Sequence, residues 1–500
     1  MLKPAALFTD GAVLCRRKEI RVFGAADSRE VRVRLTDADG TLLAESCAEV
    51  KAGRFEAGLA PQEARTGCTL TFQAGGEAAV AKNIAVGEVF LAGGQSNMEL
   101  PLCNADGGPE RIREHRDLLL RFFNVPKYAR ICPEQRQAAD AARWTAVSPG
   151  CGGENSAAAY FFACRLRAAE PELPVGIIDC YWGGTSITCW LERDVLAASA
   201  EGRRYLDDYE EKTRGITPED YLKAEKVFND TLDAWNRQVE QYKQGHPGAD
   251  WNAVTEACGL CPWNPPAGPG SPYRPAGLAE TMLHEVSPAT LTGILYYQGE
   301  EDTGKTDRYD ELMILLIRRW RELFREADLP FLFVQLPMWV DWGKEDTFLW
   351  PRLRLAQAAA RDAVPKTGMI CLLDQGEYGN IHPTNKKTVG DRLYEMAAQM
   401  LYGGGEVSPR ALEAHREGDA LIVILSAPVI TRDGQAPRLL EIAGEDGVFR
   451  PAEGVIQGSE LRIRNRETAD PASVRYAWTD YSDQVNLFGK NGLPLEPFLF

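Results

Sequence analysis

The first 85 residues alternate polar and apolar positions in the way that half-buried β-strands do. Residues 19–23 and 31–35 show this alternation most clearly, and a turn-forming stretch at 37–40 follows the second of them. Short strands at this spacing predict a small β-sandwich. We therefore expect an N-terminal β domain over residues 1–85.

From residue 86 the pattern changes to apolar runs separated by amphipathic segments. In residues 308–325, for example, Leu312, Leu316 and Trp320 fall on one face of a helix. Strands that alternate with helices predict an α/β fold with a parallel, doubly wound sheet, here over residues 86–403. The predicted strands are 89–92, 175–179, 291–297, 331–336 and 369–373. A ligand site is then expected beyond the carboxyl ends of these strands.

Residues 192–275 interrupt the α/β pattern as an insertion. The segment begins helical and charged and ends in a stretch rich in proline and glycine at 262–275. It could form a lid that shapes the substrate site or a surface elaboration, and the sequence favours neither. After residue 403 the alternation of strands returns, as at 420–425, which predicts a C-terminal β domain over 404–500. The sequence leaves open whether the two β regions form one sandwich or two.

Composition and charge narrow the functional classes. The chain has 500 residues, 44% of them hydrophobic and 26% charged, with a formal net charge of −16 and no long basic block. This charge argues against nucleic acid or an anionic membrane as a partner, although a local arginine can still bind an anionic small molecule. No apolar stretch has the length of a membrane span or of a signal peptide, so we expect a cytoplasmic protein.

The twelve cysteines are scattered, which predicts reduced structural thiols in such a compartment. Cys258 and Cys261 have the spacing of half a zinc site. A second pair does not lie nearby, so a structural interpretation is favoured over a metal site.

The candidate nucleophile is Ser96, which lies in the stretch 94–98 directly after the apolar run 89–92. A glycine-flanked serine at a strand end can present its hydroxyl at the edge of an α/β sheet, but it can also be only a helix N-cap. A serine nucleophile needs a histidine, and the chain has five. Only His382 lies on a polar loop outside any apolar period. This pair predicts a Ser-His hydrolase.

Two further stretches could stabilise the oxyanion of such a reaction. Gly183 and Gly184 follow a predicted strand and offer unencumbered backbone N–H groups, although a simple tight turn explains them equally well. Gln298 follows another strand and could aim a side-chain N–H at the same point. The three acids at 300–302 could indicate a metal site. No histidine or fourth acid is suitably spaced, so a solvated loop with a helix-capping role is preferred.

These motifs together resemble the SGNH-type hydrolases and, within them, the sialate O-acetylesterase branch of the carbohydrate acetylesterases. The resemblance is carried in chain order by residues 87–90, 94–99, 175–178, 182–187, 297–300, 329–331, 335–337 and 381–383, then by Lys386, Val389, Gly390 and Arg392, and by 492–494 with 497–498. It implies a flavodoxin-like hydrolase core with β-sandwich-like regions at both ends.

Site roles also follow from the resemblance. It implies that Ser96 is the nucleophile and His382 the general base and later general acid. The implied oxyanion donors are the backbone N–H groups of Ser96 and Gly184 and the side chain of Gln298. The resemblance implies neither a metal nor an organic cofactor.

The sequence departs from the family at one position. An aspartate usually stands two residues before the histidine, and this chain has Asn380 there. Replacing the carboxylate that orients a catalytic histidine can cost about 10⁴ in turnover. Asp374 or Glu377 could supply the carboxylate, or a backbone or Asn380 carbonyl could suffice for a Ser-His dyad. Alternatively, the chain is a weak or inactive paralogue that binds acetylated glycans.

We therefore expect an esterase that removes O-acetyl groups from a sugar or oligosaccharide, sialic acid first and xylose-type oligosaccharides or polysaccharides second. One rival is a carbohydrate-binding protein with a vestigial core. Another is a lipase-like or thioester SGNH enzyme, which would require a long apolar acyl channel. The sequence identifies neither the substrate-binding residues nor the oligomeric state.

Overall fold

The computed structural model describes residues 1–130, 132–263 and 265–500. A central sheet runs in the order β10-β9-β11-β8-β12-β13-β14. Its strands are β8 (Glu77–Gly94), β9 (Asp117–Asn124), β10 (Trp144–Val147), β11 (Val175–Tyr181), β12 (Gly293–Tyr297), β13 (Phe331–Val334) and β14 (Thr367–Ile370). The predicted parallel arrangement is confirmed from β9 to β14. It is wrong at the edge, where β10 pairs antiparallel with β9.

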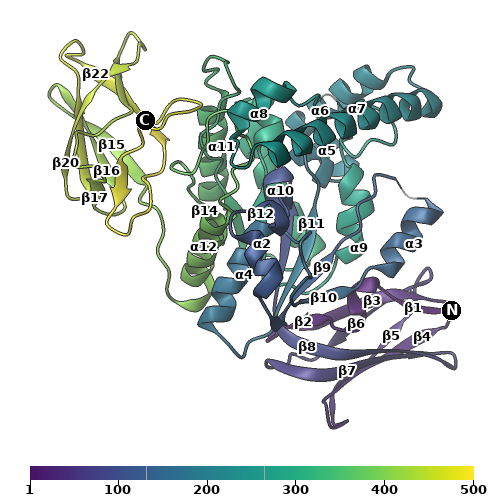
Figure 1. Cartoon of the computed structure of the whole chain (residues 1–500). Coiled ribbons are helices and arrows are strands. Elements are labelled where there is room, and N and C mark those ends of the chain that lie inside the picture. Colours follow the sequence, from purple (N-terminus) through teal and green to yellow (C-terminus); the bar gives the residue numbers. More distant parts are fainter. Residues whose placement is uncertain (131, 264) are drawn as a thin grey trace.

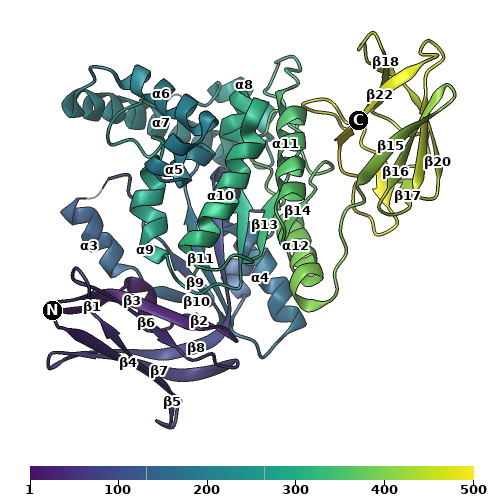
Figure 2. The same ribbon diagram turned by 180° about the vertical axis from the view of Figure 1, so that it is seen from behind.

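Helices cover both faces of this sheet, as burial of its apolar strands requires. Helices α4 (Ala157–Ala169) and α12 (Lys386–Ala397) pack together on one face, and α10 (Tyr309–Leu323) and α11 (Leu349–Ala363) pack together on the other (Figures 1 and 2). Strands β11 and β12 are buried along their whole length. The amphipathic helix predicted at 308–325 is confirmed as α10.

Shorter helices and helical turns connect these elements. They are α1 (Ser96–Glu99), α2 (Gly108–Glu114), α3 (Pro133–Ala141), α9 (His284–Val286), η1 (Ala6–Phe8), η2 (Leu102–Asn104), η3 (Ile187–Trp190), η4 (Ala279–Leu283), η5 (Glu300–Arg308) and η6 (Ala398–Tyr402).

The N-terminal strands form two layers that pack on each other. One sheet has the order β1-β3-β6, and the other contains β4, β5, β7 and the first half of β8. The rings of Phe55 and Phe72, one from each layer, have centroids 6.0 Å apart. Strand β8 then continues into the central sheet, so the predicted boundary after residue 85 falls inside one strand. The bounds are β1 (Leu2–Pro4), β2 (Val13–Cys15), β3 (Ile20–Ala26), β4 (Glu30–Thr36), β5 (Leu42–Glu49), β6 (Arg54–Leu59) and β7 (Arg65–Ala74).

The C-terminal strands form a separate pair of sheets, in the orders β15-β16-β21-β20 and β19-β18-β22-β24. Their apolar residues form a core distinct from the one shared by the N-terminal sheets and the central sheet. The two β regions are therefore two separate layered structures. The bounds are β15 (Ala411–Glu417), β16 (Ala420–Leu425), β17 (Val429–Thr431), β18 (Leu440–Gly444), β19 (Arg450–Pro451), β20 (Glu453–Gln457), β21 (Glu460–Arg464), β22 (Pro471–Tyr476), β23 (Leu487–Gly489) and β24 (Phe498–Leu499).

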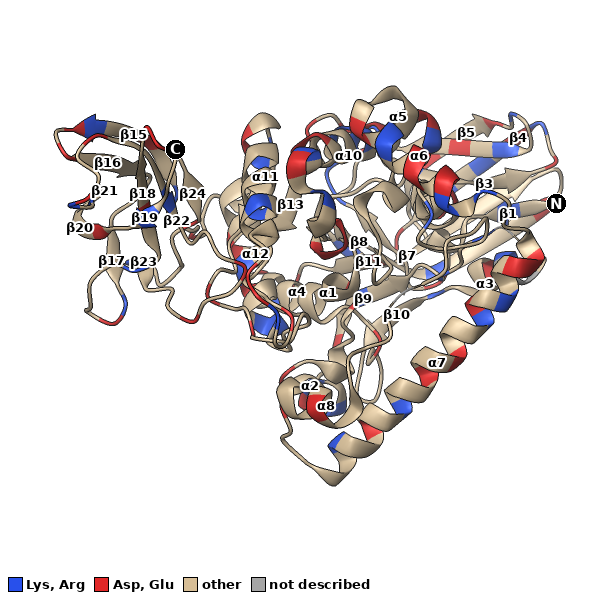
Figure 3. Cartoon of the chain, turned by 90° about the horizontal axis from the view of Figure 1, so that it is seen from above, with Lys and Arg blue, Asp and Glu red and all other residues tan. Residues whose placement is uncertain are grey.

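The described residues of the insertion at 192–275 form four helices, and those after the last helix have no regular secondary structure. The helices are α5 (Arg193–Ala198), α6 (Ala200–Thr213), α7 (Pro218–Gly245) and α8 (Trp251–Cys258). In Figure 3 the ribbon of α7 is marked by acidic and basic residues along its length, as expected for a largely solvent-exposed helix. Within the described residues, none of the helices has the length and apolarity that a membrane span requires.

Candidate active site

Ser96 begins helix α1 at the carboxyl end of the central strand β8. Gly94 has φ +131°, and a Cβ atom there would lie 2.1 Å from the carbonyl oxygen of Tyr297 on β12, so only glycine allows this close approach. The N-cap residue of α1 is Gln95, and the side chain of Ser96 does not cap the helix. The N-cap interpretation of Ser96 is therefore wrong, because its hydroxyl bonds elsewhere.

The Ser96 hydroxyl is hydrogen-bonded to His382, which lies 286 residues later in the loop between β14 and α12. The Ser96 Oγ to His382 Nε2 distance is 2.8 Å. Burial, with a smaller effect of the nearby Lys386 ammonium, lowers the pKa of His382 to about 4. The imidazole is therefore neutral at pH 7, so its Nε2 can accept the serine proton.

Neither carboxylate predicted to orient His382 contacts its ring. Both oxygens of Asp374 accept hydrogen bonds from Arg392, at 2.7 and 2.8 Å. Glu377 accepts a hydrogen bond of 2.7 Å from the Asn380 amide, and the Asn380 carbonyl accepts one of 3.0 Å from the backbone N–H of His382. Across the described parts of the chain, no carboxylate accepts a hydrogen bond from this imidazole. The structure thus contradicts the prediction that Asp374 or Glu377 supplies a carboxylate to the ring. Asn380 hydrogen-bonds to the backbone of the loop rather than to the imidazole.

A buried polar group, which we call the lysine cluster, joins the serine helix to the histidine loop. It consists of Asn97, Glu300 and Lys386. The Lys386 ammonium donates to Asn97 Oδ1 at 2.5 Å, and the Asn97 amide donates to Glu300 at 2.5 Å and to the carbonyl of Ile381 at 2.9 Å. Burial lowers the pKa of Lys386 to about 7 and raises that of Glu300. Because Ile381 precedes the histidine, the cluster fixes His382 relative to Ser96.

The glycine pair after β11 lies beside the nucleophile. A Cβ atom at Gly183 would lie 3.3 Å from the Cβ atom of Ser96, so a side chain there would crowd the nucleophile. The Gly183 N–H donates to Glu99 and is not available to a substrate. Within the described residues, the backbone N–H groups of Ser96 and Gly184 donate no hydrogen bond. Both predicted backbone donors are therefore available to an oxyanion.

The third predicted oxyanion donor, Gln298, is not available. Its amide nitrogen donates to the carbonyl of Thr185 at 3.2 Å and to Asp302 at 2.6 Å, and its amide oxygen accepts from Tyr309 at 2.7 Å. An amide group has only two N–H donors. The prediction is therefore contradicted, because both donors are already used inside the protein.

Gln298 instead belongs to a second buried group, the aspartate cluster, formed with Ser186, Tyr205 and Asp302. The Asp302 carboxylate accepts from the Ser186 hydroxyl at 2.6 Å, the Ile187 N–H at 2.8 Å, the Tyr205 hydroxyl at 2.8 Å and Gln298 at 2.6 Å. Burial raises the pKa of Asp302, and the four donors oppose this rise. The cluster ties the turn containing Gly184 to β12 and to the insertion.

The interpretation of residues 300–302 as a solvated loop is wrong for two of the three acids. Glu300 and Asp302 are buried, and only Glu301 is exposed. Burial is possible because each buried carboxylate accepts hydrogen bonds from neighbouring side chains. Within the described residues, no group of three or more histidine, cysteine, aspartate or glutamate side chains could hold a metal ion.

Sequence reasoning missed three contributions to the site. Lys386 was noted only as part of the family resemblance, although a lysine four residues after a loop histidine could have indicated a positioning role. Tyr205 and Trp263 come from the insertion. A Cβ atom at Gly184, which has φ +68°, would lie 1.9 Å from the Trp263 ring, so the indole packs directly on this glycine. The insertion therefore helps to build the site.

The chain is similar to known carbohydrate esterases. Residues 263–399 match a family model described as carbohydrate esterase, sialic acid-specific acetylesterase. The chain is 30% identical to a sialate O-acetylesterase from Homo sapiens, over 83% of this chain and 75% of that protein. It is 25% identical to a sialate O-acetylesterase from Rattus norvegicus, over 83% of this chain and 78% of that protein.

A solved structure extends the similarity to nearly the whole fold. A carbohydrate acetylesterase from Xanthomonas citri superposes with a TM-score of 0.76 and 28% sequence identity, covering 99% of this chain and 99% of that one. The similarity therefore includes the flanking sheets and the insertion as well as the central sheet.

Proposed function

The chain belongs to the sialate O-acetylesterase family of carboxylic ester hydrolases, and from this premise we propose that it removes O-acetyl groups from a carbohydrate through an acetyl-enzyme on Ser96. The observation that carries the proposal is the 2.8 Å hydrogen bond between Ser96 and a neutral His382. A serine hydroxyl becomes an effective nucleophile when a base within this distance accepts its proton.

In the first step, the Ser96 Oγ attacks the carbonyl carbon of the acetyl group and its proton passes to His382 Nε2. The carbonyl oxygen becomes an oxyanion, which the backbone N–H groups of Ser96 and Gly184 stabilise. His382 then gives its proton to the sugar oxygen as the ester bond breaks. In the second step, His382 takes a proton from water as the water oxygen attacks the acetyl carbon. His382 then returns this proton to Ser96 Oγ as the acyl bond breaks and acetate leaves.

This mechanism uses a Ser-His dyad, since within the described residues no carboxylate accepts a hydrogen bond from the histidine ring. A pKa of about 4 leaves His382 free to accept a proton at pH 7 but makes it a weak base. We therefore expect lower turnover than a carboxylate-supported triad would give. The family assignment makes the chain a carboxylic ester hydrolase, which argues against the binding-only alternative.

We infer that the central sheet is an SGNH-type, flavodoxin-like core. Numbered along the chain, the strands β11-β8-β12-β13-β14 follow the order 2-1-3-4-5 that is typical of flavodoxin-like sheets. Strands β9 and β10 extend this order at one edge. Ser96 follows β8, at the point where successive connections turn to opposite sides, which is where such folds bind ligands.

The proposed substrate is an O-acetylated sialic acid, with acetylated xylo-oligosaccharide as the second candidate. The lipase-like alternative requires a long apolar channel beside Ser96, and turnover that rises with acyl length would favour it. A cytoplasmic location also remains our prediction.

The test is acetate release from O-acetylated sialic acid and from acetylated xylo-oligosaccharide, with wild type and Ser96→Ala. We expect Ser96→Ala to lower turnover on the order of 10⁶-fold. Rapid quenching of wild type followed by mass spectrometry should show one added acetyl group on the peptide that contains Ser96. Unchanged turnover in Ser96→Ala, or an acetyl group on another residue, would overturn the mechanism.

A further inference from the structure

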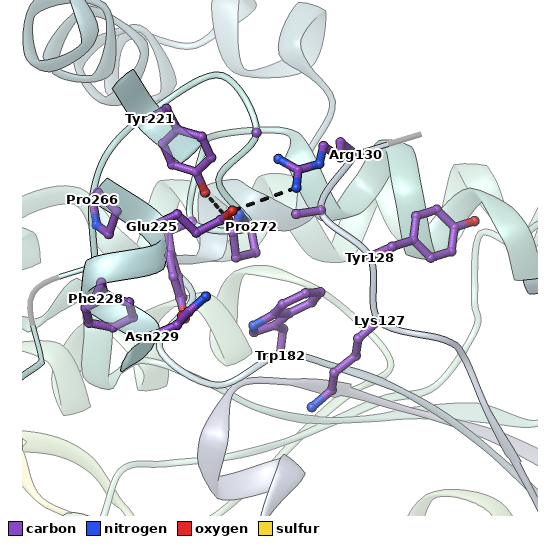
Figure 4. Close-up of a pocket in the computed structure, with 13 residues that line it drawn as sticks. Lys127, Tyr128, Arg130, Trp182, Tyr221, Glu225, Phe228, Asn229, Pro266 and Pro272 are labelled. Carbon is purple, nitrogen blue, oxygen red and sulfur yellow. Dashed lines mark hydrogen bonds and ion pairs between the residues drawn. The ribbon is translucent and has the colours of Figure 1, made fainter. Parts of the chain in front are cut away.

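A cavity of about 210 Å³ lies beside the turn after β11, which carries Gly183 and Gly184 (Figure 4). Four parts of the chain form it: the segment after β9, the turn after β11, helix α7 and the loop that ends the insertion. Trp182 lines the cavity and directly precedes Gly183, where a Cβ atom would lie 3.3 Å from the Ser96 Cβ atom. Two other lining rings, Phe228 and Tyr273, pack edge-on against Trp263, which lies on Gly184. The cavity therefore adjoins the turn that carries Gly183 and Gly184.

The walls of the cavity are mainly aromatic. Trp182, Tyr221, Phe228 and Tyr273 line it, together with prolines of the insertion loop. Pockets for small ligands typically combine such apolar walls with a few polar groups that fix the ligand's orientation. The flat faces of these rings match the C–H faces of a pyranose ring. The cavity thus suits one sugar unit.

Among the charged groups of the cavity, Arg130 is the one placed to bind an anion. Its charged lining residues are Lys127, Arg130 and Glu225, in a chain whose net charge is −16. Lys127 is paired with Glu99 outside the cavity. The Arg130 guanidinium lies 3.8 Å from Glu225 and, within the described residues, donates no hydrogen bond. Its side chain is 45% exposed and can therefore be reached by a ligand.

The surrounding chain leaves room for Arg130 and holds the cavity together. A Cβ atom at Gly270 would lie 2.7 Å from its guanidinium, so a larger residue at 270 would displace it. Arg274 donates to the carbonyl of Ala129 at 2.7 Å, which ties the insertion loop to the segment that carries Arg130. The Tyr221 hydroxyl donates to Glu225 at 2.5 Å and holds that carboxylate beside the guanidinium (Figure 4).

We propose that this cavity binds the ring of an acetylated acidic sugar and that Arg130 binds the sugar carboxylate. A guanidinium presents paired N–H groups that match the two oxygens of a carboxylate. The inference rests on the proposed function, since it names the substrate class that the Ser96 site accepts.

The experiment compares O-acetylated sialic acid with its methyl ester, in which the carboxylate charge is removed, and with 4-nitrophenyl acetate, which has no sugar. In Arg130→Gln, we expect KM for the acid to rise about tenfold, because one charge-assisted contact is lost. Acetate release from the methyl ester and from 4-nitrophenyl acetate should change less than twofold. Wild type should prefer the acid over its methyl ester, and Arg130→Gln should lose this preference.

Two further variants test whether the effect is specific to Arg130. Glu225→Gln removes the carboxylate that competes for Arg130 and should lower KM for the acid or leave it unchanged. Arg136→Gln is the matched control, because Arg136 also forms a 3.8 Å ion pair, with Glu285, but does not line the cavity. It should leave all three substrates unchanged.

The outcomes separate this inference from the proposed function. If Arg130→Gln slows the acid and the methyl ester equally, or changes neither, the carboxylate assignment is wrong even though Ser96→Ala abolishes turnover. If Ser96→Ala retains turnover, the proposed function itself fails, whatever Arg130→Gln does.

Discussion

The two buried polar clusters beside Ser96 differ in charge, and the difference separates two tasks. The lysine cluster contains a cation and a carboxylate, and it joins the serine helix to the histidine loop. The aspartate cluster contains a carboxylate whose four partners are all neutral donors, and it supports the Gly184 turn. A buried cation near a histidine changes its pKa, whereas a carboxylate surrounded by neutral donors mainly determines shape. We therefore infer that one cluster controls the base and the other the oxyanion site.

The largest effect is expected from Asp302→Asn. In the wild type, four donors bond to the Asp302 carboxylate. The amide of the variant would turn its own N–H groups toward some of these donors, which would then be buried without an acceptor. We expect the free energy of unfolding to fall by about 3 kcal/mol in urea titrations. Turnover should fall as well, but the pH at which kcat/KM falls on the acid side should not change.

Asp307→Asn is the control for this prediction. It makes the same chemical change in the same helical segment, at an exposed residue. A change in stability below about 0.5 kcal/mol is expected, as for other surface substitutions. Equal stability of the two variants would show that the aspartate cluster does not support the fold.

A smaller effect is expected from Lys386→Met, which breaks the lysine cluster. Neutral His382 is the proposed base, so kcat/KM should fall as the pH drops through its pKa of about 4. Removing the nearby cation raises that pKa, so the fall should begin at a higher pH. The free energy of unfolding should drop by about 2 kcal/mol, because Asn97 Oδ1 loses its donor. The measurement is kcat/KM for 4-nitrophenyl acetate against pH.

Lys387→Met is the matched control, since Lys387 is exposed and pairs with Asp391 on the same helix. It should not move the acid limb. The double variant Glu300→Gln/Lys386→Met should recover part of the lost stability, because the carboxylate left without its cation is removed as well. If kcat/KM of Lys386→Met falls at the same pH as that of wild type, the lysine cluster does not control the base.

The smallest effect is expected from Asn380→Asp, which introduces the acid usual in this family. The new carboxylate would face Glu377, where the amide now donates a 2.7 Å hydrogen bond. We expect a severalfold loss of turnover and a lower melting temperature rather than a gain. Glu377→Gln/Asn380→Asp reverses donor and acceptor, so it should restore both. A gain in turnover from Asn380→Asp alone would mean that the acid reaches the His382 ring.

Much of the fold was predictable because its signals are local. The apolar runs after residues 88, 174 and 330 became buried parallel strands, and the face of α10 was visible in its sequence period. Strands β9 and β10 were not predicted, and the antiparallel edge strand departs from the expected parallel order. The pairing direction of an edge strand depends on where the chain returns in space, which a short sequence window does not contain.

The site was predictable where a motif constrains the backbone. Gly94, Ser96 and the glycine pair have roles that depend on local geometry at strand ends, and the hydrogen bond between Ser96 and His382 agrees with the predicted pairing. The role of Gln298 was not predictable, because its N–H groups were used by Thr185 and Asp302. Hydrogen-bond partners of this kind are selected by packing.

Strand period, glycine turns and residue types are local features, and they were enough to predict that a serine and a histidine would meet at the edge of an α/β sheet. Three features could be seen only after folding: which carboxylates are buried, that none of the described ones contacts the His382 ring, and that the insertion packs Trp263 and Tyr205 against the site. Burial and hydrogen bonding between distant residues depend on the relative placement of whole elements. That placement results from the sum of many weak contacts across the chain, which no single motif specifies.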